Sequence, residues 1–265
     1  MPAANLPSAL GELERIGASL KDRPAIFLDY DGTLTPVVPD PSDARIGDVE
    51  RSVLATLSRK APVAIVSGRN LDELRQLVAV EGLIYSGNHG WEIEGPGIDS
   101  FQQPLADTTQ RELDRAYEIL KQRTRGLGGV VVERKRFAIA VHTRRVSSDS
   151  ARAAAVDLAS KTAAHLDGVV LSMGKEVAEL LPAVAWNKGR AVGLVLDSLS
   201  PERVPIYIGD DQTDEDGFAE AARRQGVGVV VGRPAETAAG FSLAGPGEVL
   251  AFLGDLGRRI ADEKP

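Results

Sequence analysis

Short apolar runs that end in polar turns recur at four places along this chain of 265 residues. The turns read "DYDGT", "SGRN", "GNHG" and "GDDQTDED". Apolar runs without polar alternation are typical of strands buried on both faces, as in a parallel sheet that helices cover. Because ligands bind at the carboxyl ends of the strands in such sheets, we expect the four turns to meet at one edge and form a site.

The segments between these runs predict helices. Apolar residues at helical spacing predict a helix over residues 8–20, and further helices are expected over residues 47–59 and from Asn70 onward. The strands themselves are expected at residues 25–28, 63–66, 204–208 and 227–231, with one more in "GLIYSGNHGWEIEG". Strands that alternate with helices favour an α/β fold with a parallel sheet.

The middle of the chain has another pattern, in which a helix is followed by two closely spaced strands. The helix at residues 107–123 precedes strands at residues 130–132 and 138–141, which flank the charged "ERKR" and predict an antiparallel hairpin. A second helix, at residues 149–165, precedes two strands in "GVVLSMGKEVAELLP", joined by a glycine turn. The doubled pattern predicts an α+β domain with an antiparallel sheet.

This domain is expected to be inserted into the α/β core. We place it at residues 101–184, so that the core comprises residues 1–100 and 185–265.

Composition excludes several classes of function. The 31 basic residues face 38 acidic ones, and this net charge of −7 argues against nucleic-acid or membrane partners, which usually need a positive surface. The absence of cysteine excludes disulfides and thiolate chemistry. The three histidines, His89, His142 and His165, lack zinc-site spacing. No signal peptide or membrane span is recognisable, so a cytoplasmic protein is expected, as a monomer rather than an oligomer.

Asp29 and Asp31 follow the first predicted strand, where a pair of like charges needs an explanation. A purely structural interpretation of the pair is a polar turn at a strand end. Phosphoryl transfer gives a functional one, since one aspartate can attack phosphorus while a second protonates the leaving oxygen and then activates water. Mg²⁺ would offset the repulsion around the phosphate.

The other turns offer groups for the same chemistry. Asp210 directly follows a predicted strand and is placed to join Asp29 at a magnesium site, whereas Glu215 and Asp216 fit an ordinary helix N-terminus. In "SGR", Ser67 offers a hydroxyl and the backbone offers amides at a helix start, which suits an anion.

Taken in order, "DYDGTL", "SGR", Lys188 in "WNKGRAV" and "GDDQTDED" resemble the four signature motifs of the haloacid dehalogenase superfamily of phosphatases. The resemblance implies a Rossmann-like α/β core with an inserted α+β cap of the C2 type. It implies Mg²⁺ as cofactor and the following roles: Asp29 as nucleophile, Asp31 as general acid/base, Ser67, Gly68, Arg69 and Lys188 as phosphate-binding groups, and Asp29, Asp31 (through its carbonyl), Asp210 and Asp214 around the metal.

A narrower resemblance covers most of the chain. "LDYDGTLTP", "SGNHGWE", "AVHTRR" and "GKEVAELLPAVAWNKGRAV" together are similar to the trehalose-6-phosphate phosphatases. The resemblance implies hydrolysis of trehalose 6-phosphate to trehalose and phosphate, with the inserted domain as a cap that binds the sugar. The cap residues that it implies for the sugar are Glu133, Lys135, His142, Arg144, Lys175 and Glu179. Asn88 and His89 in "GNHG" are expected to line the space between core and cap and to bind substrate.

Other functions stay open at this point. The chain departs from the family pattern at Thr143, where an aromatic residue is common, and at Leu181, where a basic residue is common. Both departures concern the sugar rather than the phosphate chemistry. The alternatives are a phosphatase for mannosyl- or glucosyl-3-phosphoglycerate, a phosphomannomutase, and, from another class, a sugar-phosphate sensor without catalysis.

Overall fold

The structure is a computed structural model, and the chain in it forms two compact units. The described residues are 6–20, 23–174, 176–200, 202–232 and 236–260. Unit 1 comprises Met1–Gln102 and Trp186–Pro265, and unit 2 comprises Gln103–Ala185.

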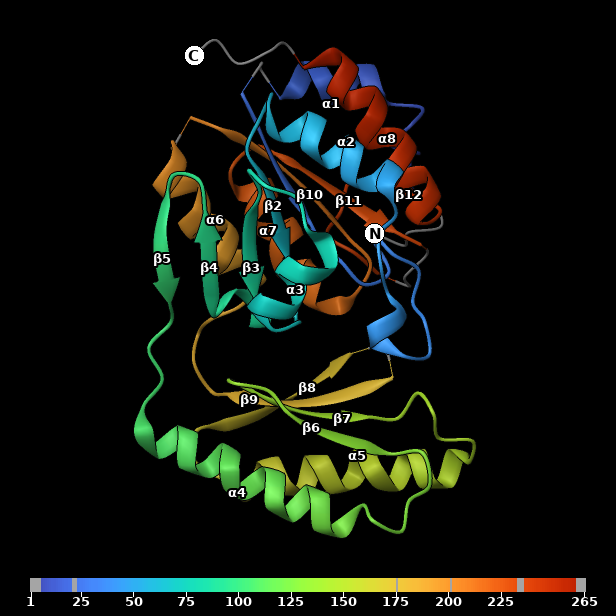
Figure 1. The fold of residues 1–265 in the computed structure, drawn as a ribbon, viewed down its shortest axis with the longest axis vertical. Coiled ribbons are helices and arrows are strands. Elements are labelled where there is room, and N and C mark those ends of the chain that lie inside the picture. Colours follow the sequence, from blue (N-terminus) through green and yellow to red (C-terminus); the bar gives the residue numbers. More distant parts are fainter. Residues whose placement is uncertain (1–5, 21–22, 175, 201, 233–235, 261–265) are drawn as a thin grey trace. The chain divides into compact units, whose positions relative to one another are not determined.

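Within the described residues, unit 1 is built on a sheet of eight strands in the order β12-β11-β10-β1-β2-β3-β4-β5 (Figure 1). The strands are β1 (Pro24–Leu28), β2 (Val63–Val66), β3 (Ile84–Gly87), β4 (Glu92–Gly95), β5 (Ile98–Gln102), β10 (Val204–Gly209), β11 (Val227–Val231) and β12 (Phe241–Leu243). Strands from β12 to β3 are parallel, and β4 and β5 extend the sheet as an antiparallel pair. The parallel sheet predicted from the apolar runs is confirmed.

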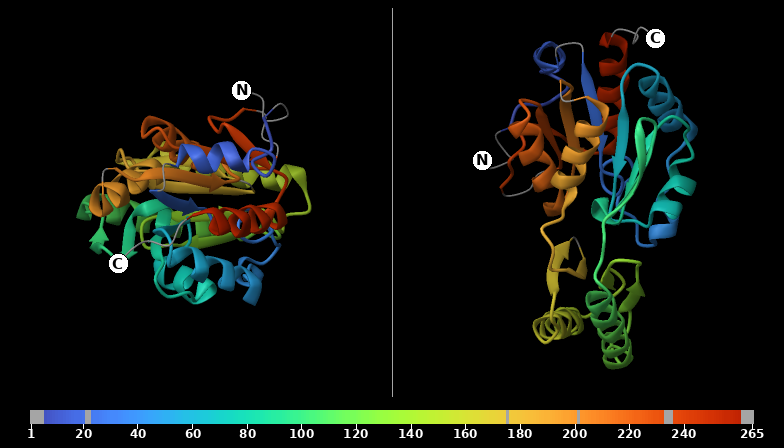
Figure 2. Two further views of the ribbon diagram at one scale, coloured as in Figure 1. Left: turned by 90° about the horizontal axis from the view of Figure 1, so that it is seen from above. Right: turned by 90° about the vertical axis from the view of Figure 1, so that its left-hand side faces the viewer.

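Helices cover both faces of this sheet. The helices are α1 (Leu13–Ser19), α2 (Asp48–Ser58), α3 (Leu71–Val78), α6 (Lys188–Leu199), α7 (Glu215–Arg223) and α8 (Pro246–Arg259), and the 3₁₀ turns are η2 (Pro41–Asp43), η3 (Asn88–Gly90) and η4 (Gln212–Asp214). Because side chains alternate along a strand, Ile26 and Leu28 pack with α1, α2, α3 and α8, whereas Phe27 packs with α6 and α7. Figure 2 shows α6 and α7 (orange) on one side of the sheet and α2 and α3 (blue to cyan) on the other. Both faces of β1 are therefore buried, which explains its unbroken apolar sequence.

The first helix is shorter than predicted. It begins at Leu13, because the chain around Ser8, where the helix was predicted to begin, pairs with Ser242 of β12 instead. The amide of Ala9 donates to the carbonyl of Ser242, and the amide of Ser242 donates to the carbonyl of Pro7. Backbone groups committed to a strand cannot also start a helix.

Unit 2 packs two helices against one sheet, whose four described strands are all antiparallel and lie in the order β6-β7-β9-β8. Its elements are α4 (Asp107–Arg123), α5 (Asp149–Ala164), β6 (Val131–Arg134), β7 (Ile139–His142), β8 (Val169–Gly174) and β9 (Val177–Pro182). The predicted hairpin is confirmed, with one correction: Glu133 and Arg134 lie in β6 rather than in the turn, because they pair with Ala140 and Ile139.

Within the described residues, none of the helices combines the length and the apolar character that a membrane crossing needs.

Candidate active site

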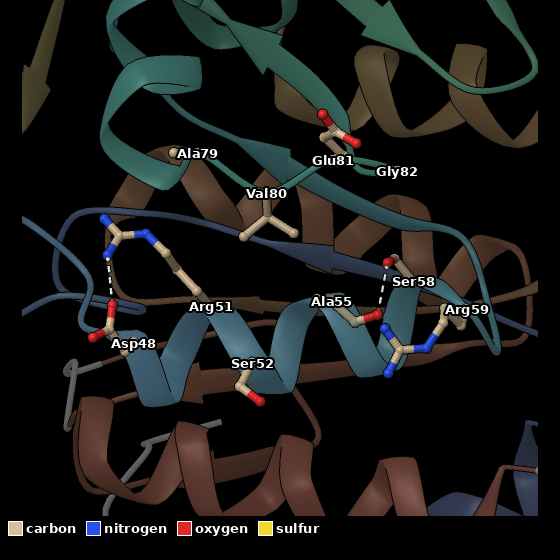
Figure 3. A pocket seen from close by; sticks show the side chains of 10 residues that line it. All are labelled: Asp48, Arg51, Ser52, Ala55, Ser58, Arg59, Ala79, Val80, Glu81 and Gly82. Atoms are coloured by element: carbon tan, nitrogen blue, oxygen red, sulfur yellow. Dashed lines mark hydrogen bonds and ion pairs between the residues drawn. The ribbon is translucent and has the colours of Figure 1, made fainter.

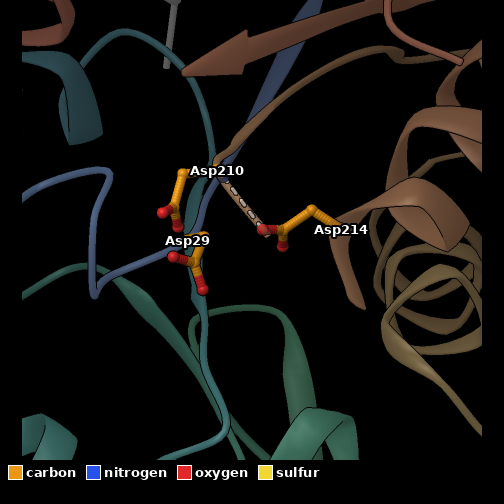
Figure 4. Close-up of side chains that lie close together, drawn as sticks. All are labelled: Asp29, Asp210 and Asp214. Atoms are coloured by element: carbon orange, nitrogen blue, oxygen red, sulfur yellow. Dashed lines mark hydrogen bonds between the residues drawn. The ribbon is translucent and has the colours of Figure 1, made fainter. Parts of the chain in front are cut away.

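Three carboxylates meet at the carboxyl edge of the sheet in unit 1. Asp29 directly follows β1 and Asp210 directly follows β10, and these strands are parallel neighbours with Leu28 opposite Ile208. Asp214 reaches the same place from η4. One carboxylate oxygen of each of the three side chains lies within 4.8 Å of the others (Figure 4). The edge predicted from the turns therefore gathers Asp29, Asp210 and Asp214.

Lys188 is the buried counter-charge of this cluster. As the first residue of α6, its side chain is only 3% exposed, and Nζ donates to Asp29 Oδ1 at 2.7 Å and to Asp214 Oδ1 at 2.6 Å. Burial by itself lowers the pKa of Lys188, but Asp214 and Asp29 outweigh it and raise the pKa well above its ordinary value. Lys188 is therefore a permanent cation in the site.

Asp214 anchors the cluster through four donors. Its Oδ1 accepts from Lys188 Nζ and from the Tyr207 hydroxyl at 2.7 Å, and its Oδ2 accepts from the amides of Asp210 and Asp211 at 3.0 Å each. A carboxylate with two donors on each oxygen is fully engaged within the protein. Tyr207 was not predicted as a site residue from the sequence. Its position as a tyrosine within an otherwise aliphatic strand could have indicated it.

One carboxylate oxygen of Asp29 is available for nucleophilic attack. Lys188 bonds to Oδ1, whereas Oδ2 accepts no hydrogen bond from the described residues. Burial raises the pKa of Asp29 well above its ordinary value; Lys188 opposes this rise, while Asp214 and Asp210 add to it. A cation beside Asp29 would favour the ionised form that a nucleophile needs.

The donor set fits Mg²⁺. Asp29 and Asp210 offer hard carboxylate oxygens, which is the ligand type that Mg²⁺ prefers. The turn after Asp31 closes over Asp210, because a Cβ built on Gly32 would lie 2.2 Å from Asp210 Oδ2. Gly32 also has φ +91°, so glycine is required there for two reasons.

Asp31 lies next to this cluster in sequence but is paired elsewhere. Its carboxylate accepts from Arg69 Nε at 2.6 Å and from a terminal guanidinium nitrogen at 2.7 Å. Arg69 also bonds to Glu73 at 2.5 Å, and these two acids raise its pKa despite burial. Sequence reasoning missed Glu73, which lies on the exposed side of α3 at the i+4 position.

The "SGR" and "GNHG" turns lie side by side, as β2 and β3 are neighbours. The amide of His89 donates to the carbonyl of Ser67 at 2.9 Å, and the amide of Asn88 donates to the carbonyl of Arg69 at 2.7 Å. Ser67 is 1% exposed, and its Oγ accepts from the amide of Arg69 at 3.2 Å. The structure thus joins Ser67, Gly68, Arg69, Asn88 and His89 into one rim.

In unit 2, the predicted sugar-binding residues form pairs. Glu133 and Glu179 both lie opposite Ala140 in neighbouring strands, so they share a face of the sheet. Lys135 Nζ donates to Glu179 Oε1 at 2.7 Å, and His142 Nε2 lies 2.8 Å from Glu133 Oε2. The hydrogen bond with His142 lowers the pKa of Glu133, although burial opposes this.

Two predicted residues of unit 2 remain, Arg144 and Lys175. Arg144 pairs with Glu176 at 3.3 Å, and Glu176 had not been singled out in the sequence. Lys175 lies outside the described residues.

Unit 1 also has a surface pocket between α2 and the connection from α3 to β3 (Figure 3). It is lined by Asp48, Arg51, Ser52, Ala55, Ser58, Arg59, Ala79, Val80, Glu81 and Gly82. Its Arg51 donates to the carbonyls of Leu77 and Val78 at the end of α3. None of the predicted site residues lines this pocket, and Arg51 holds the end of α3 in place.

Comparisons with known proteins agree with the geometry of unit 1. The family described as trehalose-phosphatase matches residues 27–246. A probable trehalose-phosphate phosphatase of Oryza sativa subsp. japonica is 36% identical over 257 residues, which cover 93% of this chain and 70% of that protein. A trehalose-phosphate phosphatase of Mycobacterium marinum is 37% identical over 266 residues, which cover 97% of this chain and 67% of that protein.

A solved structure shows the same fold. The C-terminal domain of C. albicans trehalose-6-phosphate phosphatase is similar with a TM-score of 0.82 and 27% identity, over 96% of this chain and 98% of that one. The predicted fold class, a Rossmann-like core of the haloacid dehalogenase type with an inserted α+β unit, is confirmed. This chain belongs to the trehalose-phosphatase family.

Proposed function

We propose that this chain is a Mg²⁺-dependent phosphatase that hydrolyses trehalose 6-phosphate to trehalose and phosphate. The observation that carries the proposal is the buried pairing of Lys188 with Asp29, which leaves one carboxylate oxygen of Asp29 without a hydrogen-bond donor among the described residues. The names of the relatives support trehalose 6-phosphate as the substrate.

In the first step, Asp29 Oδ2 attacks phosphorus and the bond from phosphorus to the sugar oxygen breaks, which leaves an acyl phosphate (aspartyl phosphate) on Asp29. Lys188 holds the other oxygen of Asp29, so the carboxylate is fixed in one orientation before attack. The ammonium of Lys188 also offsets the negative charge that gathers around the phosphoryl group.

Asp31 moves the protons. As an acid it donates a proton to the departing sugar oxygen, and as a base it then takes a proton from the water that attacks the phosphorus. That second step breaks the bond between phosphorus and Asp29 and restores its carboxylate. In the described conformation both oxygens of Asp31 accept from Arg69, so Asp31 must release Arg69 before it can act as the acid.

The metal would be held by the carboxylates of Asp29 and Asp210 and by the backbone carbonyl of Asp31. The chemistry that bound Mg²⁺ supplies is neutralisation of the phosphoryl oxygens. Asp214 does not fit as a direct ligand, because all four of its donors come from the protein; it keeps Lys188 and the loop after β10 in place.

The sugar is assigned to unit 2 by the family resemblance. Glu133, Lys135 and Glu179 offer charged hydrogen-bonding groups on one sheet, which suits a hydroxyl-rich disaccharide. The role of unit 2 as a specificity cap remains a prediction from the sequence. A monomeric state and a cytoplasmic location of the protein also remain predictions.

The test measures phosphate release from trehalose 6-phosphate and from glucose 6-phosphate with Mg²⁺, for the wild type and for Asp29→Asn. We expect a clear preference for the disaccharide and a loss of at least about 10³-fold in kcat for Asp29→Asn, since the variant lacks the nucleophile. Asparagine has the size of aspartate and Lys188 keeps its ion pair with Asp214, so we expect the variant to fold, and thermal unfolding checks this.

Asp48→Asn is the matched control, because Asp48 has a fully exposed side chain on α2. It should leave both kinetic constants unchanged. Equal turnover of the two substrates by the wild type would overturn the assignment of the sugar, and turnover retained in Asp29→Asn would overturn the nucleophile.

A further inference from the structure

The turn at η3 is built so closely against the "SGR" turn that its side chains belong to the same rim. Beyond the two backbone hydrogen bonds described above, the ring of His89 lies over Gly68. A Cβ built on Gly68 would lie 2.6 Å from His89 Cε1 and 2.7 Å from Nε2. Glycine at position 68 therefore allows the turn of His89 to close over the chain that follows β2.

Asn88 and His89 adopt an unusual backbone conformation. Their φ angles are 50° and 57°, in the left-handed region that residues other than glycine rarely occupy. Asparagine tolerates this region better than most residues, because its short side chain can hydrogen-bond locally. Consecutive residues of this kind persist where the surrounding structure holds them, and they gather at functional sites.

A buried carboxylate determines how the Asn88 side chain is oriented. Asn88 is 3% exposed and Glu92, at the start of β4, is 7% exposed. Asn88 Nδ2 donates to Glu92 Oε2 at 2.8 Å. An ionised carboxylate only accepts hydrogen bonds, so the amide nitrogen of Asn88 must face it. The amide oxygen then faces the other way.

That amide oxygen is buried and has no partner. Asn88 Oδ1 accepts no hydrogen bond from the described residues. A buried acceptor without a donor is unfavourable unless a ligand or a water satisfies it. A buried donor without a partner among the described residues lies against the same turn. This donor is Trp186 Nε1, and a Cβ built on Gly90 would lie 3.3 Å from it.

The chemistry of these atoms selects the ligand group. A phosphate dianion and a carboxylate only accept hydrogen bonds, so neither can satisfy the amide oxygen of Asn88. A hydroxyl group can, and it can also accept from a donor such as Trp186 Nε1. An unpaired acceptor beside a phosphate-binding turn therefore fits a hydroxyl of the sugar that carries the phosphate.

We propose that Asn88 Oδ1 accepts a hydrogen bond from a hydroxyl of the leaving sugar, and that Glu92 is the positioning residue that presents it. The proposal rests on the proposed phosphatase function. It assigns a binding atom and a ligand group to Asn88, which the sequence already predicted to bind substrate, and it adds Glu92 as a new positioning residue within unit 1. Sites that bond a substrate hydroxyl discriminate strongly against substrates that lack it.

The first experiment compares trehalose 6-phosphate with p-nitrophenyl phosphate, which carries no sugar hydroxyl. The variant is Asn88→Gly, because glycine adopts the left-handed backbone without strain. We expect kcat/KM for trehalose 6-phosphate to fall about tenfold or more, while kcat/KM for p-nitrophenyl phosphate stays within about threefold.

The second experiment exchanges the two partners. In Asn88→Asp alone, two carboxylates face each other, and the loss should match that of Asn88→Gly. In the double variant Asn88→Asp/Glu92→Gln, the new glutamine amide donates to the new carboxylate at position 88, which again presents an oxygen to the sugar. We expect the preference for trehalose 6-phosphate over p-nitrophenyl phosphate to return to within about threefold of the wild type.

Glu94→Gln is the matched control, because Glu94 lies on the same strand but is partly exposed and pairs with Arg75. It should leave the preference unchanged. Equal losses on both substrates in Asn88→Gly would show that Asn88 only supports the turn or holds a water, and would overturn the proposal. A wild type without activity on trehalose 6-phosphate would instead overturn the proposed function.

Discussion

At the scale of single residues, the candidate active site is a small set of buried charges that hold one another. Asp29, Lys188 and Asp214 are each at most 5% exposed, and each ion pair within this set is also a hydrogen bond. Burying charges is unfavourable unless every group is paired, so removal of one partner should disturb the others. Tyr207 is an uncharged neighbour of this set, since its hydroxyl donates to Asp214. A change at Tyr207 should therefore disturb the buried charges least.

Tyr207→Phe should lower kcat about tenfold and leave KM nearly unchanged. The variant removes one of the donors that orient Asp214, and Asp214 in turn orients Lys188 toward Asp29. The phenyl ring keeps its edge-to-face contact with Phe218, so folding should be retained. Steady-state kinetics on trehalose 6-phosphate provide the measurement.

Tyr85→Phe serves as its control. This hydroxyl is also buried and donates to the carbonyl of Val80 at 2.6 Å, but it contacts none of the acid cluster. Both variants should lose similar stability, while only Tyr207→Phe slows turnover. A normal kcat in Tyr207→Phe would contradict the role assigned to the hydroxyl.

At the scale of elements, the site depends on how closely helix α6 approaches α7. Lys188 is the first residue of α6, and the next residue, Gly189, lies against the backbone of α7. A Cβ built on Gly189 would lie 2.4 Å from the carbonyl oxygen of Asp216. The small residue at this contact therefore determines where the Lys188 side chain begins.

Gly189→Ala should destabilise the protein by about 1–3 kcal/mol, as overpacking does, and should also slow turnover because α6 must shift. Thermal unfolding and kcat measure the two effects.

Gly254→Ala, in the middle of α8, is the contrasting variant. Its Cβ would meet only Arg258 Nη1 at 3.9 Å, so alanine should stabilise the helix by up to about 1 kcal/mol with normal kinetics. Equal effects of the two variants would contradict the assigned contact.

At the scale of the whole molecule, the chain has two units with separate hydrophobic cores. The core of unit 2 is formed by α4, α5 and their sheet, whereas residues from both segments of unit 1 form the cores on the two faces of the large sheet. Asp29 and Asp210, the two carboxylates proposed to hold Mg²⁺, both belong to unit 1.

Mg²⁺ should stabilise unit 1 selectively. At a concentration about 100-fold above its Kd, binding adds about 2.7 kcal/mol, which corresponds to a rise of roughly 5–10 °C in the melting temperature. Hydrogen exchange should slow in β1 and β10 but not in β6 to β9.

Asp210→Asn removes a proposed ligand and should abolish this shift. A shift of the same size in that variant would place the cation elsewhere.

Much of the fold and of the site could be predicted, because both depend on patterns that are local in sequence. The run "AIFL" is a strand and Asp29 follows it, so a parallel sheet brings Asp29 to the same edge as Asp210. The start of α1 could not be predicted, since the residues before Leu13 pair with Ser242 of β12, far along the chain. Nothing in the local pattern records that pairing.

The sequence by itself determined most of the strands and helices in order, although not β4, β5, β12 or α8. It also determined the α+β pattern of the middle segment and the polar turns that carry the phosphatase motifs. Only the tertiary structure decided which atoms meet: Arg69 with Asp31, Tyr207 with Asp214, and Glu92 with Asn88. The physical reason is that strand and helix periodicity acts over a few residues. Hydrogen bonds between side chains depend instead on packing, which joins residues as distant as Asp29 and Lys188, 159 positions apart.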